Sequence, residues 1–305
     1  MKSRRFKAPN GRRLRHTSDK LAQSLAAIDW NIPAQTADFT RLAPDTASEN
    51  GPFAHYQTDA FDIRMVAGTI VTVFGAGSVG SYLSQFLGPA QLQQNVVDFK
   101  KVELKHTQGG RTIYDHTLIG MKKVDALKRK LERDHVGTTV NPLPYNVAEL
   151  PNIELVRMFN RSWLVFLAID DPKQILRISD LAYSIVEVIQ VAVHAKARSG
   201  HLAISIPLVT PCIRCTLEIH SEKDIRRLDG EPGNSLDIAH VAQEAARIGL
   251  DILYSKATGK DITRWDVSKN LIYISNTKQE ELSPDGPGLH FEGSQRRAGC
   301  LICNI

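Results

Sequence analysis

Long apolar runs are absent from the sequence, and none approaches the ~18 residues that a transmembrane helix requires. The basic amino-terminal segment also lacks the apolar stretch that a secretory signal peptide needs. Internal repeats and low-complexity segments are missing as well. These absences argue against a membrane-spanning protein, and we expect a cytoplasmic protein with no membrane partner.

Acidic residues are missing from the start of the chain, where seven lysine and arginine residues precede Asp19. The net charge of the whole chain is only +5, so the remainder is close to neutral. A basic arm can bind nucleic acid or an acidic partner, and a solvated arm is the alternative. tRNA is therefore a possible partner, although the charge alone does not favour it.

The length and composition are those of an ordinary soluble protein. The 305 residues are enough for one large α/β domain or two smaller ones. The hydrophobic fraction of 42% and the charged fraction of 23% are unremarkable. We expect residues 1–59 to form a basic arm, a short helix at residues 18–30 and a wrapping loop, and residues 60–305 to form the folded domain.

The most informative stretch is residues 68–98. The apolar run Ile70–Phe74 predicts a buried parallel strand, which leads into Gly75-Ala76-Gly77-Ser78-Val79-Gly80 and then a helix. In such a loop the three glycines permit, in order, a tight turn, close approach of a phosphate and helix–strand packing. The helix start offers N–H groups to an anion, and the next strand ends at Asp98, where an acid meets ribose hydroxyls. The pattern predicts a nucleotide site, and the alternative is a glycine turn that only packs.

Strand and helix patterns alternate through the next hundred residues. They predict a helix from Gly120, a strand at 138–143, a turn or short helix at 147–160, a strand at 163–169, a helix at 172–184 and a strand at 186–193. Residues 99–119 are too irregular to predict an element. The alternation is typical of a doubly wound, Rossmann-like, mostly parallel sheet in the α/β class.

The carboxyl-terminal third has a different character. Gly200, flanked by His194 and His201, predicts the turn of a hairpin, and hence an antiparallel extension of the sheet. We expect both histidines to be turn residues. The remaining expectations are a mobile crossover loop at 219–236, a helix at 237–254, a strand at 270–275 and a polar tail at 276–299.

The chain has four cysteines, arranged as Cys212-x-x-Cys215 and Cys300-x-x-Cys303. Two such pairs are typical of one tetrahedral thiolate site for Zn²⁺, and four sulfurs also suit an iron–sulfur cluster. Because four protein ligands leave no open position for water, we expect a structural zinc knuckle that joins two distant segments. Redox pairs or free thiols are the alternative.

In combination, these motifs resemble the ThiF/MoeB/HesA family of adenylyltransferases, which are related to ubiquitin-activating enzymes. The resemblance rests on the glycine loop, Asp98, an arginine in the next loop, Gly120-x-x-Lys123, a strand that ends in aspartate, and the paired CxxC motifs. It covers about residues 60–303.

The resemblance implies that ATP with Mg²⁺ is the nucleotide and that a carboxylate is adenylated with release of pyrophosphate. The residues that it assigns to nucleotide binding are Gly75, Gly77, Gly80, Asp98, Lys123 and Asp171, and those that it assigns to catalysis are Arg111, Lys123 and Asp170.

The implied roles follow from the charge that develops in the reaction. Arg111 and Lys123 would stabilise charge on the phosphoryl oxygens, and Asp170 or Asp171 would hold Mg²⁺. Two alternatives remain open from the residues alone. Lys123 can be a solvated lysine, and either aspartate can simply cap the helix that begins at Pro172.

The chain departs from the family pattern in places. The family usually has Asp-x-Asp where this chain has Asp98-Phe99-Lys100, and its Asn-Leu-x-Arg-Gln motif is altered across residues 106–111. A nucleotide-binding pseudoenzyme, or a partner subunit of the same fold, is therefore an alternative. An NAD(P)-dependent oxidoreductase is a further one, although it does not account for Lys123 or the cysteines.

The resemblance also implies a homodimer and a substrate that is a ubiquitin-like protein, a peptide, or a small or tRNA-linked carboxylate. Many members pass the adenylate to a cysteine in the crossover loop, but residues 219–236 contain none. If all four cysteines bind metal, we expect no thioester step.

Overall fold

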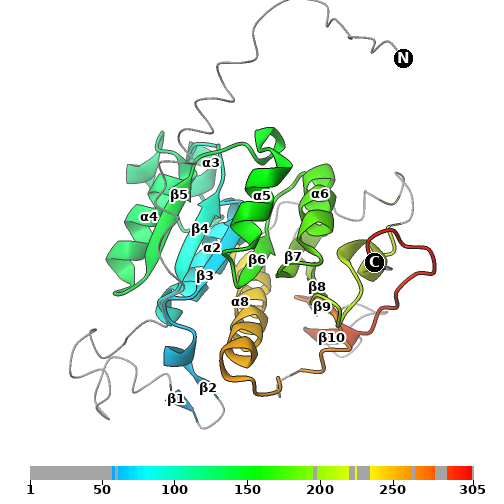
Figure 1. The fold of residues 1–305 in the computed structure, drawn as a ribbon. Coiled ribbons are helices and arrows are strands. Elements are labelled where there is room, and N and C mark those ends of the chain that lie inside the picture. The colour runs from blue at the N-terminus through cyan, green and yellow to red at the C-terminus, as the bar shows by residue number, and fades with distance from the viewer. Residues whose placement is uncertain are drawn as a thin grey trace, which may run out of the picture. The chain divides into compact units, whose positions relative to one another are not determined.

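The computed structural model describes residues 57–58, 61–194, 198–219, 224, 234–262, 265–278 and 287–303, all within the compact unit Ser48–Ile305. These residues form an α/β fold in which one mixed sheet has the strand order β10-β9-β8-β7-β6-β3-β4-β5 (Figure 1). A two-stranded sheet, β1 (Gln57–Thr58) and β2 (Phe61–Asp62), precedes it. The predicted fold class is confirmed.

The parallel part of the sheet is the half in which the sequence predicts a nucleotide site. Its strands are β3 (Ile70–Phe74), β4 (Gln93–Val97), β5 (Thr139–Leu143), β6 (Leu164–Leu167) and β7 (Glu187–His194). Helices cover this sheet on both sides, and all four residues of β6 are buried. The chain runs from β3 to β4 and β5 on one side, then returns to β6 and β7 on the other. The direction of winding therefore reverses between β3 and β6, and ligands bind outside the strand ends at such a point.

The helices divide between the two faces of the sheet. They are α2 (Ser78–Leu87), α3 (Leu104–Thr107), α4 (Lys123–Asp134), α5 (Asn152–Phe159), α6 (Pro172–Ala182), α7 (Ile213–Thr216) and α8 (Ser235–Thr258). The short 3-10 helices are η4 (Ile63–Met65), η5 (Gly88–Ala90), η6 (His116–Leu118) and η7 (Val147–Glu149). Figure 1 shows α5 and α6 over the face toward the viewer. Helices α2 and α8 pack against each other, and their apolar side chains form the main core with β3, β6, β7 and β8.

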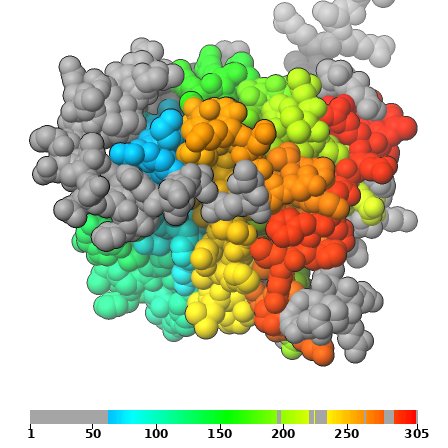
Figure 2. Space-filling model, turned by 90° about the horizontal axis from the view of Figure 1, so that it is seen from below, coloured from blue at the N-terminus to red at the C-terminus, as the bar shows by residue number. Residues whose placement is uncertain are grey.

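The antiparallel extension is also present, with one strand that the sequence pattern does not reveal. Strands β8 (Ser199–Ser205) and β9 (Leu271–Ser275) continue the sheet, and β10 (Gly288–Glu292) pairs with β9. Figure 2 shows the orange and red residues of this part of the chain next to one another. The predicted polar tail is therefore wrong for 288–292. No residue of this edge strand is fully buried, and its only apolar side chains that pack on the core are Leu289 and Phe291. Such a short alternation is a weak signal.

The predicted roles of Gly200 and its neighbours are wrong as well. Gly200 does not form the turn, because it lies inside β8 and pairs with Val193 of β7. A Cβ atom on Gly200 would lie 2.7 Å from Cγ2 of Val241 in α8. The glycine therefore allows α8 to pack closely on the sheet. His194 and His201 are strand residues rather than turn residues, and their rings share a hydrogen bond of 2.7 Å.

Other expectations lie outside the described residues, namely the helix at 18–30, the wrapping loop apart from the β1 residues, and most of the crossover loop at 219–236. The last two residues of that predicted loop, Ser235 and Leu236, belong to α8. Among the described residues, no helix is both long enough and apolar enough to cross a membrane.

Candidate active site

A cavity of about 560 Å³ opens at the carboxyl ends of β3, β4 and β6. The strand register explains its position. Phe74 of β3 pairs with Val97 of β4 on one side and with Leu167 of β6 on the other. The segments that follow these strands therefore meet at one edge of the sheet. The predicted site residues that border the cavity are Gly75, Gly77, Asp98, Arg111, Lys123, Asp170 and Asp171.

The glycine loop forms the floor of the cavity. Gly75 has a φ of +99°, and a Cβ atom there would lie 2.3 Å from the carbonyl oxygen of Ala168. Gly80 does not border the cavity, because it packs beneath the loop, where a Cβ atom would lie 1.9 Å from the carbonyl oxygen of Gly75. A Cβ atom on Gly77 would meet no atom of the described residues within 4 Å. Gly77 also caps α2 without a side-chain hydrogen bond, so the helix start is open to an anion.

Asp98 connects the loop to the segment after β4. Its Oδ2 accepts a hydrogen bond of 2.9 Å from the N–H of Ala76, and its Oδ1 accepts one of 2.8 Å from the N–H of Lys100. Each carboxylate oxygen has a second lone pair, so both can accept another hydrogen bond from a ligand hydroxyl. The position is suited to a ribose, as the sequence predicts.

Lys123 lies at the first position of α4 and is 4% exposed. The alternative of a solvated lysine is therefore wrong. Burial lowers the pKa of its ammonium group, whereas the nearby Asp98 carboxylate raises it. The ammonium group has no hydrogen-bond or ion-pair partner among the described residues, although it borders the cavity. A buried cation without a partner is suited to a bound anion.

Arg111 follows the loop at Gly109 and Gly110, both of which have positive φ angles of about 60° (62° and 63°). The side chain of Arg111 borders the cavity, and its Nε is buried without a hydrogen-bond partner among the described residues. An unsatisfied buried donor is costly, and an anionic ligand would satisfy it.

The two aspartates after β6 have different surroundings. Asp171 is the N-cap of α6, because its Oδ1 accepts hydrogen bonds from the N–H groups of Lys173 and Gln174. Asp170 makes no such cap, and its carboxylate lies 3.7 Å from Nζ of Lys100. Mg²⁺ is commonly held by one or two carboxylates together with substrate phosphates. Asp170 supplies one such carboxylate at the cavity, so the residues present fit Mg²⁺ in that mode.

Two residues near the site have roles that the sequence motifs do not reveal. The hydroxyl of Tyr114 is buried and lies 2.9 Å from the carbonyl oxygen of Ala76 and 3.3 Å from that of Lys123. Tyr114 thereby joins the glycine loop to the start of α4, and no local pattern signals this contact. Lys100 also borders the cavity. It stands where the family usually has the second aspartate of Asp-x-Asp, and this departure is the sequence feature that could have identified it as a site residue.

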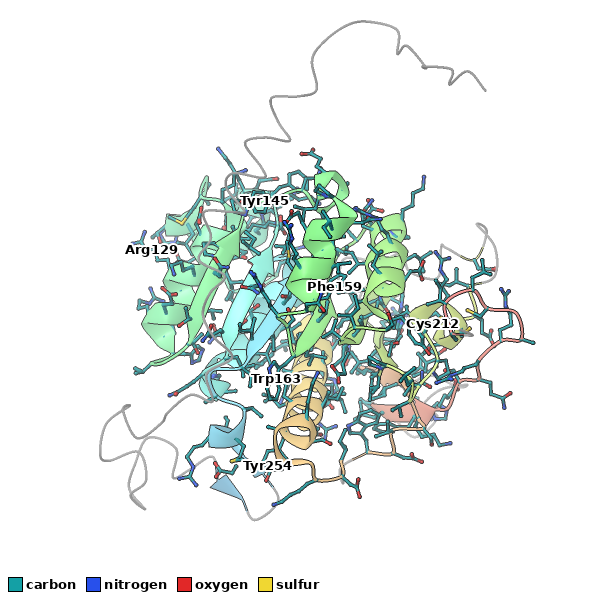
Figure 3. The ribbon with its side chains drawn as sticks, in the orientation of Figure 1. Arg129, Tyr145, Phe159, Trp163, Cys212 and Tyr254 are labelled. Atoms are coloured by element: carbon teal, nitrogen blue, oxygen red, sulfur yellow. The ribbon has the colours of Figure 1, made fainter. Side chains whose placement is uncertain are left out.

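The four cysteines form a separate cluster. Their Sγ atoms all lie within 4.8 Å of one another, with 3.8 Å between Cys212 and Cys300 and 3.5 Å between Cys215 and Cys303. Zn–S bonds of about 2.3 Å in a tetrahedron place the sulfurs about 3.8 Å apart, so the cluster has the dimensions of a metal site. Figure 3 shows Cys212 well away from Tyr145, which borders the cavity.

The fold and the cavity define a Rossmann-like nucleotide-binding protein, because the glycine loop, the strand-end acid and the cationic side chains meet where the sheet reverses its winding. The profile of the ThiF family matches residues 63–243, more than half of the sequence, and the chain belongs to this family. A comparison with curated protein sequences finds no match.

Solved structures show the same fold at low sequence identity. E. coli MccB with ATP has a TM-score of 0.62 and 15% identity, over 82% of this chain and 72% of that chain. The microcin C7 biosynthetic enzyme MccB in complex with N-formylated MccA has a TM-score of 0.64 and 14% identity, over 86% and 77%. PaaA has a TM-score of 0.60 and 15% identity, over 91% and 82%. The family and this fold support ATP-dependent adenylation of a carboxylate as the general class of reaction.

Proposed function

We propose that the chain activates a polypeptide carboxylate by transferring AMP to it from ATP. The observation that carries this proposal is the convergence of an open glycine loop, the Asp98 carboxylate, Arg111 and Lys123 on one cavity. Within the described part of the chain, Nε of Arg111 has no hydrogen-bond partner. These groups have the chemistry that recognises a ribose and a chain of phosphates.

In the proposed reaction, an oxygen of the substrate carboxylate forms a bond to the α-phosphorus of ATP. The bond from that phosphorus to the bridging oxygen breaks, and pyrophosphate leaves with the electron pair. No general base is required, because a carboxylate is already ionised at neutral pH. Arg111 and Lys123 stabilise the charge on the phosphoryl oxygens, and the N–H groups at the start of α2 bind the phosphates. Asp170 would hold Mg²⁺, which neutralises phosphate charge when bound.

We further propose that the acyl group passes from the adenylate to its acceptor without a cysteine thioester. The chain has four cysteines, and all four belong to the cluster described above. We propose Zn²⁺ as its metal, because four sulfur ligands at tetrahedral spacing suit it. No cysteine would then remain as a nucleophile.

A polypeptide substrate is favoured by the similarity to MccB, which has been determined both with ATP and with N-formylated MccA. An N-formyl group is typical of a polypeptide amino terminus. A ubiquitin-like protein, a short peptide and a small or tRNA-linked carboxylate differ in the size of the group behind the reacting carboxylate. A substrate panel therefore distinguishes them.

We also propose a homodimer, a cytoplasmic location and an adenylation domain that spans residues 60–305. Light scattering tests the dimer, and a fully active monomer would contradict it.

Oxygen labelling tests the proposed chemistry directly. A substrate with an ¹⁸O-labelled carboxylate should yield AMP that carries ¹⁸O, because the attacking oxygen stays on phosphorus when the acyl group leaves. Asp98→Ala should abolish the labelled AMP, whereas Lys101→Ala should retain it, since Lys101 is exposed and does not border the cavity. Unlabelled AMP from the wild type would show that water attacks, and would overturn adenylation.

The departure at Lys100 favours a second candidate, a pseudoenzyme that binds ATP without using it. Retained ATP binding with no pyrophosphate release from any carboxylate would identify that function.

A further inference from the structure

Lys100 occupies a fixed place at the mouth of the cavity. Its N–H donates to Oδ1 of Asp98 over 2.8 Å, and its carbonyl oxygen accepts the N–H of Lys123 over 2.9 Å. The backbone of Lys100 is thus held between the two residues that flank the expected ribose and phosphate positions. Its Nζ lies 3.7 Å from Asp170 and 5.9 Å from the ring centre of Phe99, both of which also border the cavity.

The ammonium groups of Lys100 and Lys123 face the same space. Both residues border the cavity. Burial lowers the pKa of Lys123, the Asp98 carboxylate raises it, and the charge of Lys100 lowers it. Two lysines in proximity repel one another, and an anion between them relieves that repulsion.

The charge of the cavity differs from that of an Asp-x-Asp site. The charged side chains that border it are Asp98, Lys100, Arg111, Lys123, Asp170 and Asp171, so cations and anions are equal in number. With aspartate at position 100, four anions would face two cations. A polyanion therefore meets less repulsion here than it would at a site with that aspartate.

The contact between Lys100 and Asp170 is easily broken. Their side chains are 47% and 79% exposed, and exposed ion pairs of this kind contribute little net stability. A triphosphate carries more charge than one carboxylate and offers several acceptor oxygens to the ammonium group.

We propose that Lys100 is a phosphate-binding residue that Asp170 holds in place until ATP enters, and that it reduces the dependence of ATP binding on Mg²⁺. The inference rests on ATP as the nucleotide of the proposed function. When ATP binds, Lys100 moves from Asp170 to the phosphates, and the Asp170 carboxylate is free to hold a cation.

Calorimetric titration with ATP, in Mg²⁺ and in EDTA, tests this inference without measuring turnover. Chelation should weaken ATP binding to the wild type by less than about fivefold. Lys100→Ala should weaken binding about tenfold in EDTA, because a charge-assisted contact is lost, and clearly less in Mg²⁺. Lys100→Arg should restore the wild-type pattern. Asp170→Asn should bind ATP in EDTA at least as tightly as the wild type, because it leaves the lysine unpaired.

Lys101→Ala is the matched control, because that neighbouring lysine is exposed and lies outside the cavity. The ligand-free melting temperature of Lys100→Ala should equal that of Lys101→Ala, since the ion pair is exposed. If wild type binds ATP and the two alanine variants have equal affinities in EDTA, the role of Lys100 is overturned and the proposed function stands. If the wild type binds no ATP in either buffer, both are overturned.

Discussion

Lys123 shows how function and stability oppose each other at a single residue. Lys123 borders the cavity, the residue is 4% exposed, and burial lowers the pKa of its ammonium group. A charge in that position destabilises the ligand-free protein and becomes favourable when an anion binds.

Replacing Lys123 with methionine separates these effects, because methionine has a similar length and no charge. We expect Lys123→Met to keep the free energy of unfolding unchanged or to raise it by up to about 1 kcal/mol, and to weaken ATP binding at least about tenfold. Chemical denaturation and calorimetry measure the two quantities. Parallel losses of both would show that Lys123 is mainly structural.

His201 gives the stability of the protein a defined pH dependence. It is 3% exposed, its Nε2 lies 2.7 Å from Oε1 of Gln190, and its Nδ1 faces His194. Burial, together with the second imidazole, lowers its pKa from 6.5 to about 3. Between these values the unfolded chain binds a proton at His201 that the folded chain does not, so stability is lost as the pH falls below 6.5.

The free energy of unfolding should therefore fall by about 2 kcal/mol from this residue between pH 7 and pH 5. His201→Gln should flatten the dependence over that range, although the variant is less stable overall. His116→Gln changes an exposed histidine and should keep the wild-type slope. Equal slopes for all three proteins would contradict the assignment.

At the scale of elements, β3, the glycine loop and α2 form one unit whose glycines have different tasks. Gly80 leaves no room for a side chain, because a Cβ atom would overlap the backbone of Gly75. Gly77 borders the cavity, and a Cβ atom there would have no described atom within 4 Å. Substitutions at Gly77 and Gly80 should therefore distinguish the effect on ligand binding from the effect on packing.

Gly77→Ala should fold with nearly the stability of the wild type and bind ATP at least about tenfold more weakly, because its methyl group occupies the phosphate space. Gly80→Ala should lower the free energy of unfolding by about 3 kcal/mol, because it forces apart the loop and α2. Thermal melting and calorimetry on both variants check this pair. Unchanged ATP affinity in Gly77→Ala would place the phosphates elsewhere.

At the scale of the whole molecule, the cysteine cluster joins segments far apart in sequence. Cys212 is the N-cap of α7 and Cys215 lies within that helix, whereas Cys300 and Cys303 follow β10. The N–H of Cys212 lies 3.3 Å from Sγ of Cys303, so the two CxxC pairs are in direct contact. A metal bound there would tie residues 300–303 to α7.

One Zn²⁺ per chain is expected by elemental analysis. Its removal by a chelator, or Cys303→Ser, should lower the melting temperature by at least about 5 °C, because metal binding is coupled to folding. ATP affinity should change little, since the cluster is separate from the cavity. Loss of ATP binding with preserved melting would contradict a structural role.

The sequence predicts some parts of the fold more clearly than others. Strands β3 and β6 are almost entirely buried, and their sequences are apolar apart from Thr72 of β3. The glycine loop after β3 is a strong local signal. The edge strand β10 is half exposed and lacks such a signal.

The same distinction applies to the site. Gly75, Asp98 and Lys123 stand in recognisable spacing, so the sequence places them together. The contact between Lys100 and Asp170 depends on the register of β4, β3 and β6, which brings the ends of distant strands to one edge. Tyr114 likewise acts through a tertiary hydrogen bond.

The most direct test of the central claim is ATP–pyrophosphate exchange across a panel of carboxylates that includes polypeptide carboxyl termini, a ubiquitin-like protein and small or tRNA-linked acids. We expect exchange that requires one class of carboxylate, that is lost in Asp98→Ala and Lys123→Met, and that persists in Lys101→Ala. Absence of exchange with every carboxylate, in a protein that still binds ATP, would contradict adenylation and leave a nucleotide-binding pseudoenzyme.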